Sequence, residues 1–149
     1  NIPGFEATLK LYNNWSETSK FIENAINGDT DQSLYGFLHD NTYSAVYTTN
    51  LLMRASDFMI TKPSELAFYP IPKLLLQRVG GHEAWGAIRA SEIGDATPEC
   101  EGLEFTLQVL NSLVEEDDLL LMYNEQIVKL KSIGVYDGAY RVVEIASKR

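Results

Sequence analysis

The chain has 149 residues, of which 45% are hydrophobic and 22% charged, the balance of an ordinary globular protein rather than a disordered or fibrous one. A chain of this length buries roughly 70% of its unfolded surface, so its core needs no metal ion or disulfide. The longest apolar run is far shorter than the roughly 20 residues of a membrane-spanning helix, which argues against an integral membrane protein. We expect a single globular domain over residues 1–149.

The acidic residues are unevenly placed. The formal net charge is −9, from 12 basic and 21 acidic residues, which argues against direct binding to nucleic acid or to anionic membranes. Residues 90–128 contain ten acidic residues and no Lys or Arg, whereas the rest of the chain holds 11 acidic and 12 basic residues. This segment predicts a surface for a basic protein partner. The candidate partner-binding acids are Glu99, Glu101, Glu115, Glu116, Asp117 and Asp118.

The first half of the chain predicts helices. Ser16 can cap a helix that runs to about Asn27, and a second short helix is predicted over residues 31–38. Residues 42–60 favour a helix, although part of their pattern also alternates as in a strand. Pro72 can open a helix that ends at Gly80 and Gly81. Residues 82–93 have helical spacing, and Gly94 is placed to end that helix.

The second half changes character. Residues 103–109 alternate apolar and polar, and residues 119–123, 127–133 and 139–146 are apolar runs separated by short turns. The fold class predicted is therefore α+β, with a helical N-terminal half followed by an antiparallel β-meander. The alternative is an all-α helical bundle, because the apolar residues of 103–130 also fit two helices with Gly134 as a cap. At the turn before the last run, Tyr136 is predicted to be exposed and to bind a partner.

No catalytic or cofactor motif stands out. His82 follows a glycine pair and could act as an acid or base if a cleft lay beside it, which makes His82, Glu83 and Trp85 the candidate residues of a pocket. His39 fits the end of a helix better than an active site. Cys100 lies between two glutamates, which disfavour a reactive thiolate. Spacings typical of zinc, calcium or phosphate sites are absent, so we expect no metal or cofactor.

Helices followed by strands in a chain of this size resemble the cone-shaped fold of nuclear transport factor 2-like proteins. That resemblance implies a pocket between helix and sheet that often binds a small ligand.

Three functional hypotheses follow. The first is a non-enzymatic acidic protein-binding domain, such as an inhibitor, an immunity factor or an assembly subunit. The second is a cone-shaped pocket protein that binds or converts a small molecule, and the third is a nucleic-acid mimic that binds a basic protein. The single cysteine favours the cytoplasm, unless a targeting segment preceded Asn1. The sequence leaves open whether the chain forms a homo-oligomer.

Overall fold

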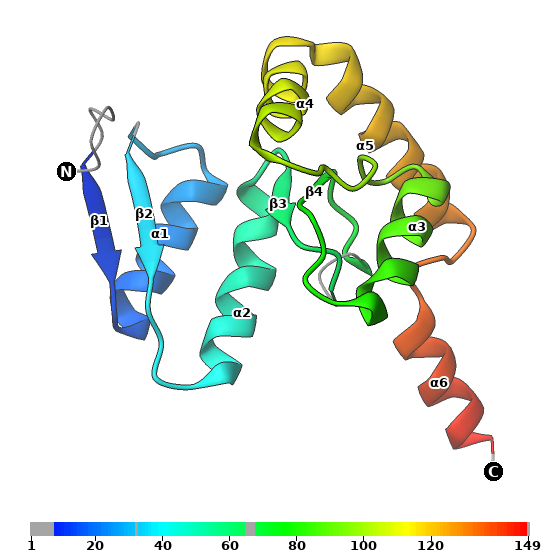
Figure 1. Cartoon of the computed structure of the whole chain (residues 1–149). Coiled ribbons are helices and arrows are strands. Elements are labelled where there is room, and N and C mark those ends of the chain that lie inside the picture. Colours follow the sequence, from blue (N-terminus) through cyan, green and yellow to red (C-terminus); the bar gives the residue numbers. More distant parts are fainter. Residues whose placement is uncertain (1–7, 32, 65–67, 149) are drawn as a thin grey trace. The chain divides into compact units, whose positions relative to one another are not determined.

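The computed structural model describes residues 8–31, 33–64 and 68–148, with the side chain of Asp117 left out. The chain divides into two compact units, Asn1–Ser56 and Asp57–Arg149, which are described separately below. Figure 1 shows the elements of each unit along the chain.

The first unit is built on two parallel strands joined by a helix. Its elements are β1 (Leu9–Tyr12), α1 (Trp15–Ile26), β2 (Leu34–Phe37), α2 (Thr42–Leu52) and the short 3₁₀ helix η1 (Met53–Ala55). The two strands pair in parallel, with Leu9 opposite Leu34 and Tyr12 opposite Phe37. Both helices begin at an asparagine cap, since the Asn14 and Asn41 side chains each accept a backbone N–H from the first turn.

Aromatic rings fill the space between this sheet and α1. The rings of Tyr12 and Phe37 stack with centroids 5.4 Å apart, and Phe21 of α1 lies 4.4 Å from Tyr35. Such offset and tilted pairs add to the free energy that burial of the rings supplies. The four rings of Tyr12, Phe21, Tyr35 and Phe37 are half-buried and hold α1 against the sheet, whereas Trp15, Tyr43 and Tyr47 are exposed.

The second unit is built around a buried parallel strand. Its elements are β3 (Met59–Thr61), β4 (Lys73–Leu75), the 3₁₀ helix η3 (Gly81–Glu83), α3 (Ala84–Ile93), α4 (Leu103–Glu115), α5 (Asp117–Ser132) and α6 (Gly138–Ser147). β3 pairs in parallel with one edge of β4. Isolated parallel bridges join Lys73 to Ala96 and Leu76 to Cys100, so the segment 96–100 lies along the other edge.

Helices cover both faces of β4. Successive strand residues point to opposite faces, and Leu74 and Leu75 are both completely buried. Leu75 packs with Ala87 and Ala90 of α3, whereas Leu74 packs with Leu113 of α4 and with α5. This arrangement, a parallel strand covered by helices on both faces, is typical of α/β folds (Figure 1).

The predicted antiparallel meander is wrong. Residues 103–115, 117–132 and 138–147 are helices, and the strands that do pair are parallel. The all-α alternative is also wrong as a fold class, because the chain contains strands. Its two helices within residues 103–134 are nevertheless confirmed, and Gly134 has the positive φ of 76° expected of a helix cap.

The burial pattern explains why the meander fails. In α4 the inward residues are Thr106, Val109, Leu110 and Leu113, which follow the helical spacing i, i+3, i+4 and i+7. Three of the four residues that the alternation would have buried, Leu103, Phe105 and Leu107, are exposed. The alternation that indicated a strand covers only seven residues. The helical spacing of apolar residues continues over a longer stretch and was therefore the better indicator.

Two predicted helices of the first 80 residues are strands instead. Residues 34–37 form β2 within the predicted helix 31–38, and residues 73–75 form β4 directly after Pro72. β4 is buried on both faces, and such a strand reads as a continuous apolar run that periodicity does not separate from a helix. β2 has only four residues, too few for its period to show. The helices predicted to end at about Asn27 and at Gly94 are confirmed, as is the first part of the helix predicted from Thr42.

The element order behind the cone-shaped resemblance is also not found. Strands precede or alternate with helices among the described residues, and helices rather than strands end the chain. In the part of the chain that the structure describes, no helix combines the length and the apolar character needed to cross a bilayer.

Candidate functional site

A pocket of about 340 Å³ lies at the carboxyl ends of β3 and β4. The residues Lys62 to Ser64, which directly follow β3, form one wall. The first residues of the η3–α3 helical segment, reached from β4 by a short turn, form the other wall. The lining residues are Lys62, Pro63, Ser64, Phe68, His82, Glu83, Trp85 and Gly86.

Close packing of backbone fixes the two walls against each other. Pro63 is buried, and a Cβ atom on Gly86 would lie 3.4 Å from the Pro63 carbonyl oxygen. This is an ordinary van der Waals distance, so the first turn of α3 lies next to the strand end without requiring glycine there. On the turn before α3, a Cβ atom on Gly80 would lie 2.7 Å from the His82 ring. Gly80 therefore leaves the space that the His82 ring occupies.

Glu83 is the buried anchor of the pocket. Its Oε1 accepts a hydrogen bond from Lys62 Nζ at 2.6 Å, and its Oε2 accepts the backbone N–H groups of Val79 at 2.9 Å and Gly80 at 3.4 Å. The Lys62 ammonium first, and the Val79 N–H second, hold the pKa of Glu83 at about 2. Glu83 is therefore ionised at neutral pH, and its bonds make it a structural group rather than a general base.

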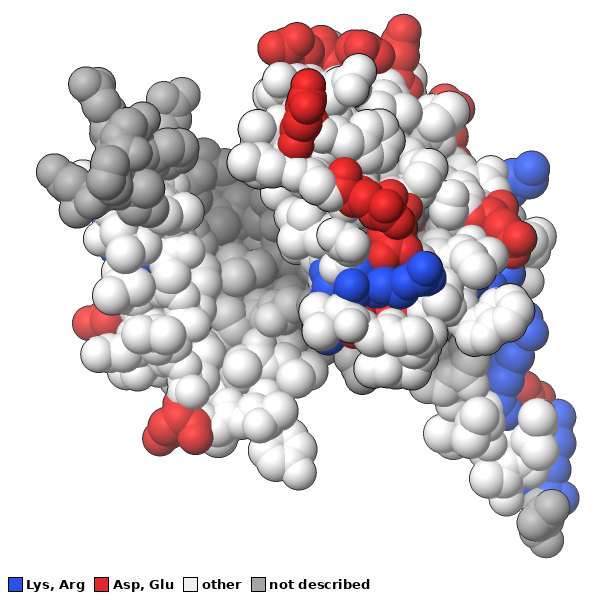
Figure 2. Space-filling model, in the orientation of Figure 1, with Lys and Arg blue, Asp and Glu red and all other residues white. Residues whose placement is uncertain are grey.

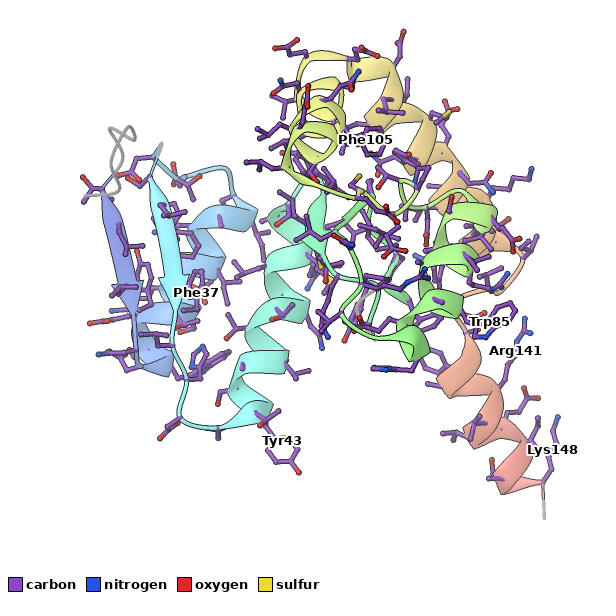
Figure 3. The ribbon with its side chains drawn as sticks, viewed as in Figure 1. Phe37, Tyr43, Trp85, Phe105, Arg141 and Lys148 are labelled. Atoms are coloured by element: carbon purple, nitrogen blue, oxygen red, sulfur yellow. The ribbon has the colours of Figure 1, made fainter. Side chains whose placement is uncertain are left out.

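Two large aromatic side chains stand at the pocket with much of their surface in solvent. Trp85 is 78% exposed and Phe68 is 61% exposed. In Figure 3 the Trp85 ring projects away from the ribbon at the start of α3. Exposed indole and phenyl rings beside a concave surface offer flat apolar faces to a planar ligand.

The structure brings together His82, Glu83 and Trp85, the three pocket candidates of the sequence. The sequence did not single out Lys62, Ser64 or Phe68, which line the same pocket. The sequence could have indicated these residues only by their position after the segment that ends at Thr61. The parallel pairing of β3 with β4 is needed to show that this strand end faces residue 83.

The acidic candidates are spread over several elements. Glu101, Glu115, Glu116 and Asp118 are exposed, whereas the side chain of Asp117 lies outside the described residues. Figure 2 shows acidic side chains gathered where α4 meets α5, with no basic side chain among them. Glu99 is different, since its carboxylate accepts the backbone N–H of Arg78 at 2.6 Å and pairs with the Arg78 guanidinium.

Tyr136 is not at an exposed turn tip. It is half-buried, and its hydroxyl donates to Asp95 Oδ2 at 2.7 Å. Asp95 also pairs with Lys73 at 3.0 Å, and both of these side chains are completely buried. The Lys73 ammonium donates further to the carbonyl oxygens of Tyr69 and Ile71, which gives each of its three N–H groups an acceptor. This network ties β4, the segment before residue 96 and the α5–α6 connection together.

Cys100 and the metal-binding residue types form no centre among the described residues. Cys100 is buried, and burial raises the pKa of its thiol. In the described ranges, no three His, Cys, Asp or Glu side chains come close enough to hold a metal ion. The pocket at the strand ends is therefore the site on which we base the functional argument.

Comparison with known proteins places the chain in a family. A model of a domain of unknown function, DUF6938, matches residues 1–147. The chain belongs to this family. The match covers residues of both compact units. No curated protein and no solved structure matches the chain.

Proposed function

We propose that residues 57–149 bind a small molecule in the pocket at the carboxyl ends of β3 and β4. The ligand class is a planar ring with an anionic substituent, a combination that nucleotides carry. The observation that supports this most directly is the position of the pocket on the parallel strands.

The position matters because of how parallel sheets are built. The loops that leave the carboxyl ends of parallel strands gather at one edge, and ligands of open α/β sheets bind in the crevice outside that edge. The residues directly after Thr61 line this pocket, and so does the helical segment 82–86 that follows β4 along the chain. A pocket formed elsewhere on the unit would not have this support.

The lining chemistry selects the ligand class. Trp85 offers a ring face to a base or another flat ring. The Lys62 ammonium is half-exposed while it pairs with Glu83, and the ten-residue helix α3 starts at the pocket with the positive end of its dipole. The Glu83 carboxylate is already bonded to Lys62 and to two backbone N–H groups, so it is not an open acceptor for a cationic ligand.

The test uses the two tryptophans of the chain. Trp15→Phe leaves Trp85 as the sole tryptophan, and its fluorescence is titrated with ADP, GDP, UDP and AMP. We expect a saturable change with at least one of them. Trp85→Ala should weaken the binding of that nucleotide at least about fivefold in calorimetry, because loss of a stacked aromatic ring costs about 1–3 kcal/mol.

Tyr140→Ala provides the matched control. Tyr140 is an exposed aromatic residue of α6 that does not line the pocket, so its removal should leave the affinity unchanged. If none of the four nucleotides binds up to about 1 mM, where binding still supplies about 4 kcal/mol, the proposed ligand class is wrong.

A second candidate function uses the acidic surface of α4 and α5. Glu115, Glu116 and Asp118 are exposed and have no ion-pair partner in the described part of the chain. Such a one-sign surface favours a partner of opposite charge. The partner proposed is a protein with a basic surface.

The test of this second candidate is a comparison of charge variants. We expect the triple variant E115Q, E116Q and D118N to lose, in pull-downs from source lysate at low salt, a basic protein that the wild type retains. The control E17Q, E23Q and D29N removes the same charge from the first unit. Equal binding of the wild type and both variants would contradict the proposal.

A further inference from the structure

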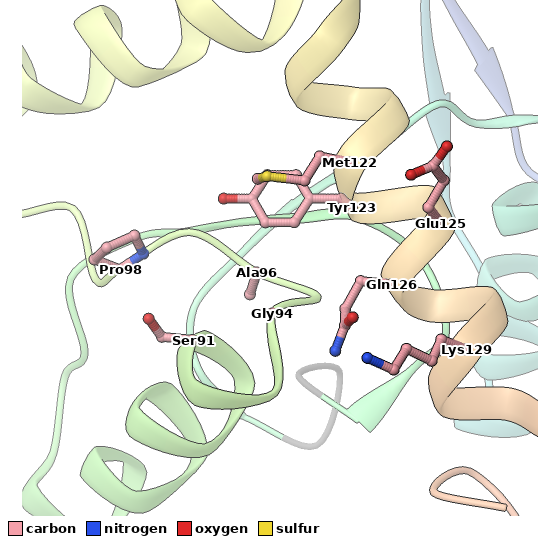
Figure 4. Close-up of a pocket in the computed structure, with 9 residues that line it drawn as sticks. All are labelled: Ser91, Gly94, Ala96, Pro98, Met122, Tyr123, Glu125, Gln126 and Lys129. Carbon is pink, nitrogen blue, oxygen red and sulfur yellow. The ribbon is translucent and has the colours of Figure 1, made fainter. Parts of the chain in front are cut away.

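A second and larger cavity, of about 530 Å³, lies in the same unit between α5 and the segment that joins α3 to residue 98. Figure 4 shows its lining, which comes from the end of α3, from the loop 94–98 and from the middle of α5. This loop leads into the segment 96–100, so the cavity lies near the amino end of that segment. It shares no residue with the pocket at the strand ends.

Small side chains create the cavity. Ser91, Gly94 and Ala96 face α5, where larger side chains would fill the space. The helix α5 is held across the opening by Gln126, whose Nε2 donates to the Ile93 carbonyl oxygen at 2.7 Å. A Cβ atom on Gly94 would lie only 3.2 Å from Gln126 Cγ. The end of α3 and α5 are therefore closely packed at the hydrogen bond between Gln126 and Ile93. The hollow is therefore maintained by defined contacts.

The walls of the cavity are mainly apolar, with a few polar groups directed inward. Ala96 and the Tyr123 ring are buried, and Met122 adds a flexible apolar side chain. In Figure 4 the ends of Gln126 and Lys129 point into the cavity, whereas the Glu125 carboxylate points away from it. An apolar hollow with a few convergent polar groups has the composition of small-molecule sites.

The charge of the cavity selects the ligand. Lys129 is its one basic lining residue, and among the described residues no acidic side chain lies within ion-pair distance of its ammonium. Ser91 adds a hydroxyl on the α3 side. A carboxylate accepts a hydrogen bond from the Lys129 ammonium, and hydrogen bonds between charged groups are the stronger ones.

We propose that this cavity binds a small amphipathic carboxylate. The apolar body lies against Ala96, Met122 and the Tyr123 ring, and the carboxylate meets the Lys129 ammonium. This site is separate from the pocket at the strand ends, and neither proposal depends on the other.

The experiment compares a charged probe with its neutral counterpart on the full chain. 4-Phenylbutyrate and 4-phenyl-1-butanol share the same apolar body, and calorimetry measures the binding of each. Lys129→Met should weaken 4-phenylbutyrate about tenfold or more and leave the alcohol within about twofold, because a hydrogen bond to a charged group contributes about 1.5–3 kcal/mol.

Lys131→Met is the matched control. Lys131 lies on the same last turn of α5 and is exposed, but it does not line the cavity. It should change neither affinity, whereas equal losses in the two lysine variants would overturn the proposal as an effect of net charge alone. Absence of 4-phenylbutyrate binding up to about 10 mM, a free energy of less than about 3 kcal/mol, would also overturn it.

A cavity-filling variant tests the location. Ser91→Phe places a ring in the hollow and should abolish binding of both probes, provided that circular dichroism shows the helices intact. Trp85→Ala should leave both affinities unchanged, because Trp85 lines the other pocket. Loss of 4-phenylbutyrate binding in Trp85→Ala but not in Ser91→Phe would place the probe in the pocket at the strand ends and refute the inference. Should Ser91→Phe fail to fold, the lysine pair decides the question.

Discussion

The buried Lys73–Asp95 pair is a costly feature that its surroundings compensate. Burial lowers the pKa of Lys73, whereas the Asp95 charge works against that shift. Tyr136 supplies the remaining contact to Asp95, and burial together with the bond to Asp95 raises the pKa of its phenol. Asp95 Oδ1 has no hydrogen-bond partner among the described residues, so the carboxylate depends on the contacts to Oδ2.

We therefore predict that Tyr136→Phe destabilises the chain. Removal of the hydroxyl leaves a buried carboxylate with one bond fewer, which should cost about 2 kcal/mol of the free energy of unfolding in urea. Tyr140→Phe is the control, because Tyr140 is 80% exposed and should change nothing measurable. Equal stability of wild type and Tyr136→Phe would show that the bond does not hold the α5–α6 connection.

Glu83 makes the stability depend on pH. Its folded pKa of about 2 lies below the ordinary value of 4.5, so the unfolded chain binds the proton more tightly. The stabilisation is complete above pH 4.5 and is lost as the pH falls from 4.5 towards 2. Glu83→Gln should therefore be less stable than the wild type at pH 7, and the difference should shrink below pH 4.5.

The measurement is urea unfolding of both proteins at a series of pH values. Glu144→Gln serves as the control, because Glu144 forms an exposed pair with Lys148 one turn away on α6. Its difference from the wild type should stay small at every pH. A Glu83→Gln difference that does not vary with pH would contradict the role assigned to the Glu83 carboxylate.

At the scale of elements, sequence patterns identified helices with clear ends. α3 was found because Gly94 stops it in the left-handed region. α1 was found because its apolar residues have helical spacing, although its cap is Asn14 and not the predicted Ser16, which lies inside the helix. β2 and β4 were missed because strands of four and three residues hold too little of any period. Their partners are set by parallel pairing across long separations, which no local pattern encodes.

The same limit applies to the pocket. His82, Glu83 and Trp85 lie within four consecutive residues, so a local pattern was enough to group them. Lys62 joins them only through the register of β3 on β4, and Tyr136 reaches Asp95 across 41 positions. The chemistry of the site was thus partly visible in the sequence, while the partners that fix it were not.

The end of α3 gives a prediction at this scale. Gly94 has a φ of +79°, which costs other residues about 1 kcal/mol, and a Cβ atom there would lie 3.2 Å from Gln126 Cγ of α5. Gly94→Ala should therefore destabilise the chain by more than Gly28→Ala. Gly28 also follows the end of a helix and has nearly the same φ of +78°, but no atom lies within 4 Å of its added Cβ, so it reports the backbone cost alone.

Thermal and urea unfolding of these two variants give the comparison. A larger loss in Gly94→Ala measures the packing of α3 against α5. Equal losses would mean that this contact adjusts freely and that Gln126 does not fix the distance between the two elements.

At the scale of the whole molecule, the two compact units raise the question of what folds alone. Residues 57–149 contain their own parallel strands, helices on both faces of β4, and both pockets. Residues 1–56 form a unit of the size at which isolated domains are marginal. The single domain expected over residues 1–149 stays a prediction. The family match over residues 1–147 does not separate the two units from each other.

We predict that a fragment of residues 57–149 folds without the first unit. It should give a helical circular dichroism spectrum and a cooperative thermal transition, because Leu74, Leu75 and Leu113 already have their packing partners within it. The fragment of residues 1–56 is the matched comparison, and its transition should be broader or absent. If instead residues 57–149 unfold on their own and only the full chain melts cooperatively, the apolar side chains exposed within this unit need the first unit to cover them, and residues 1–149 are one domain.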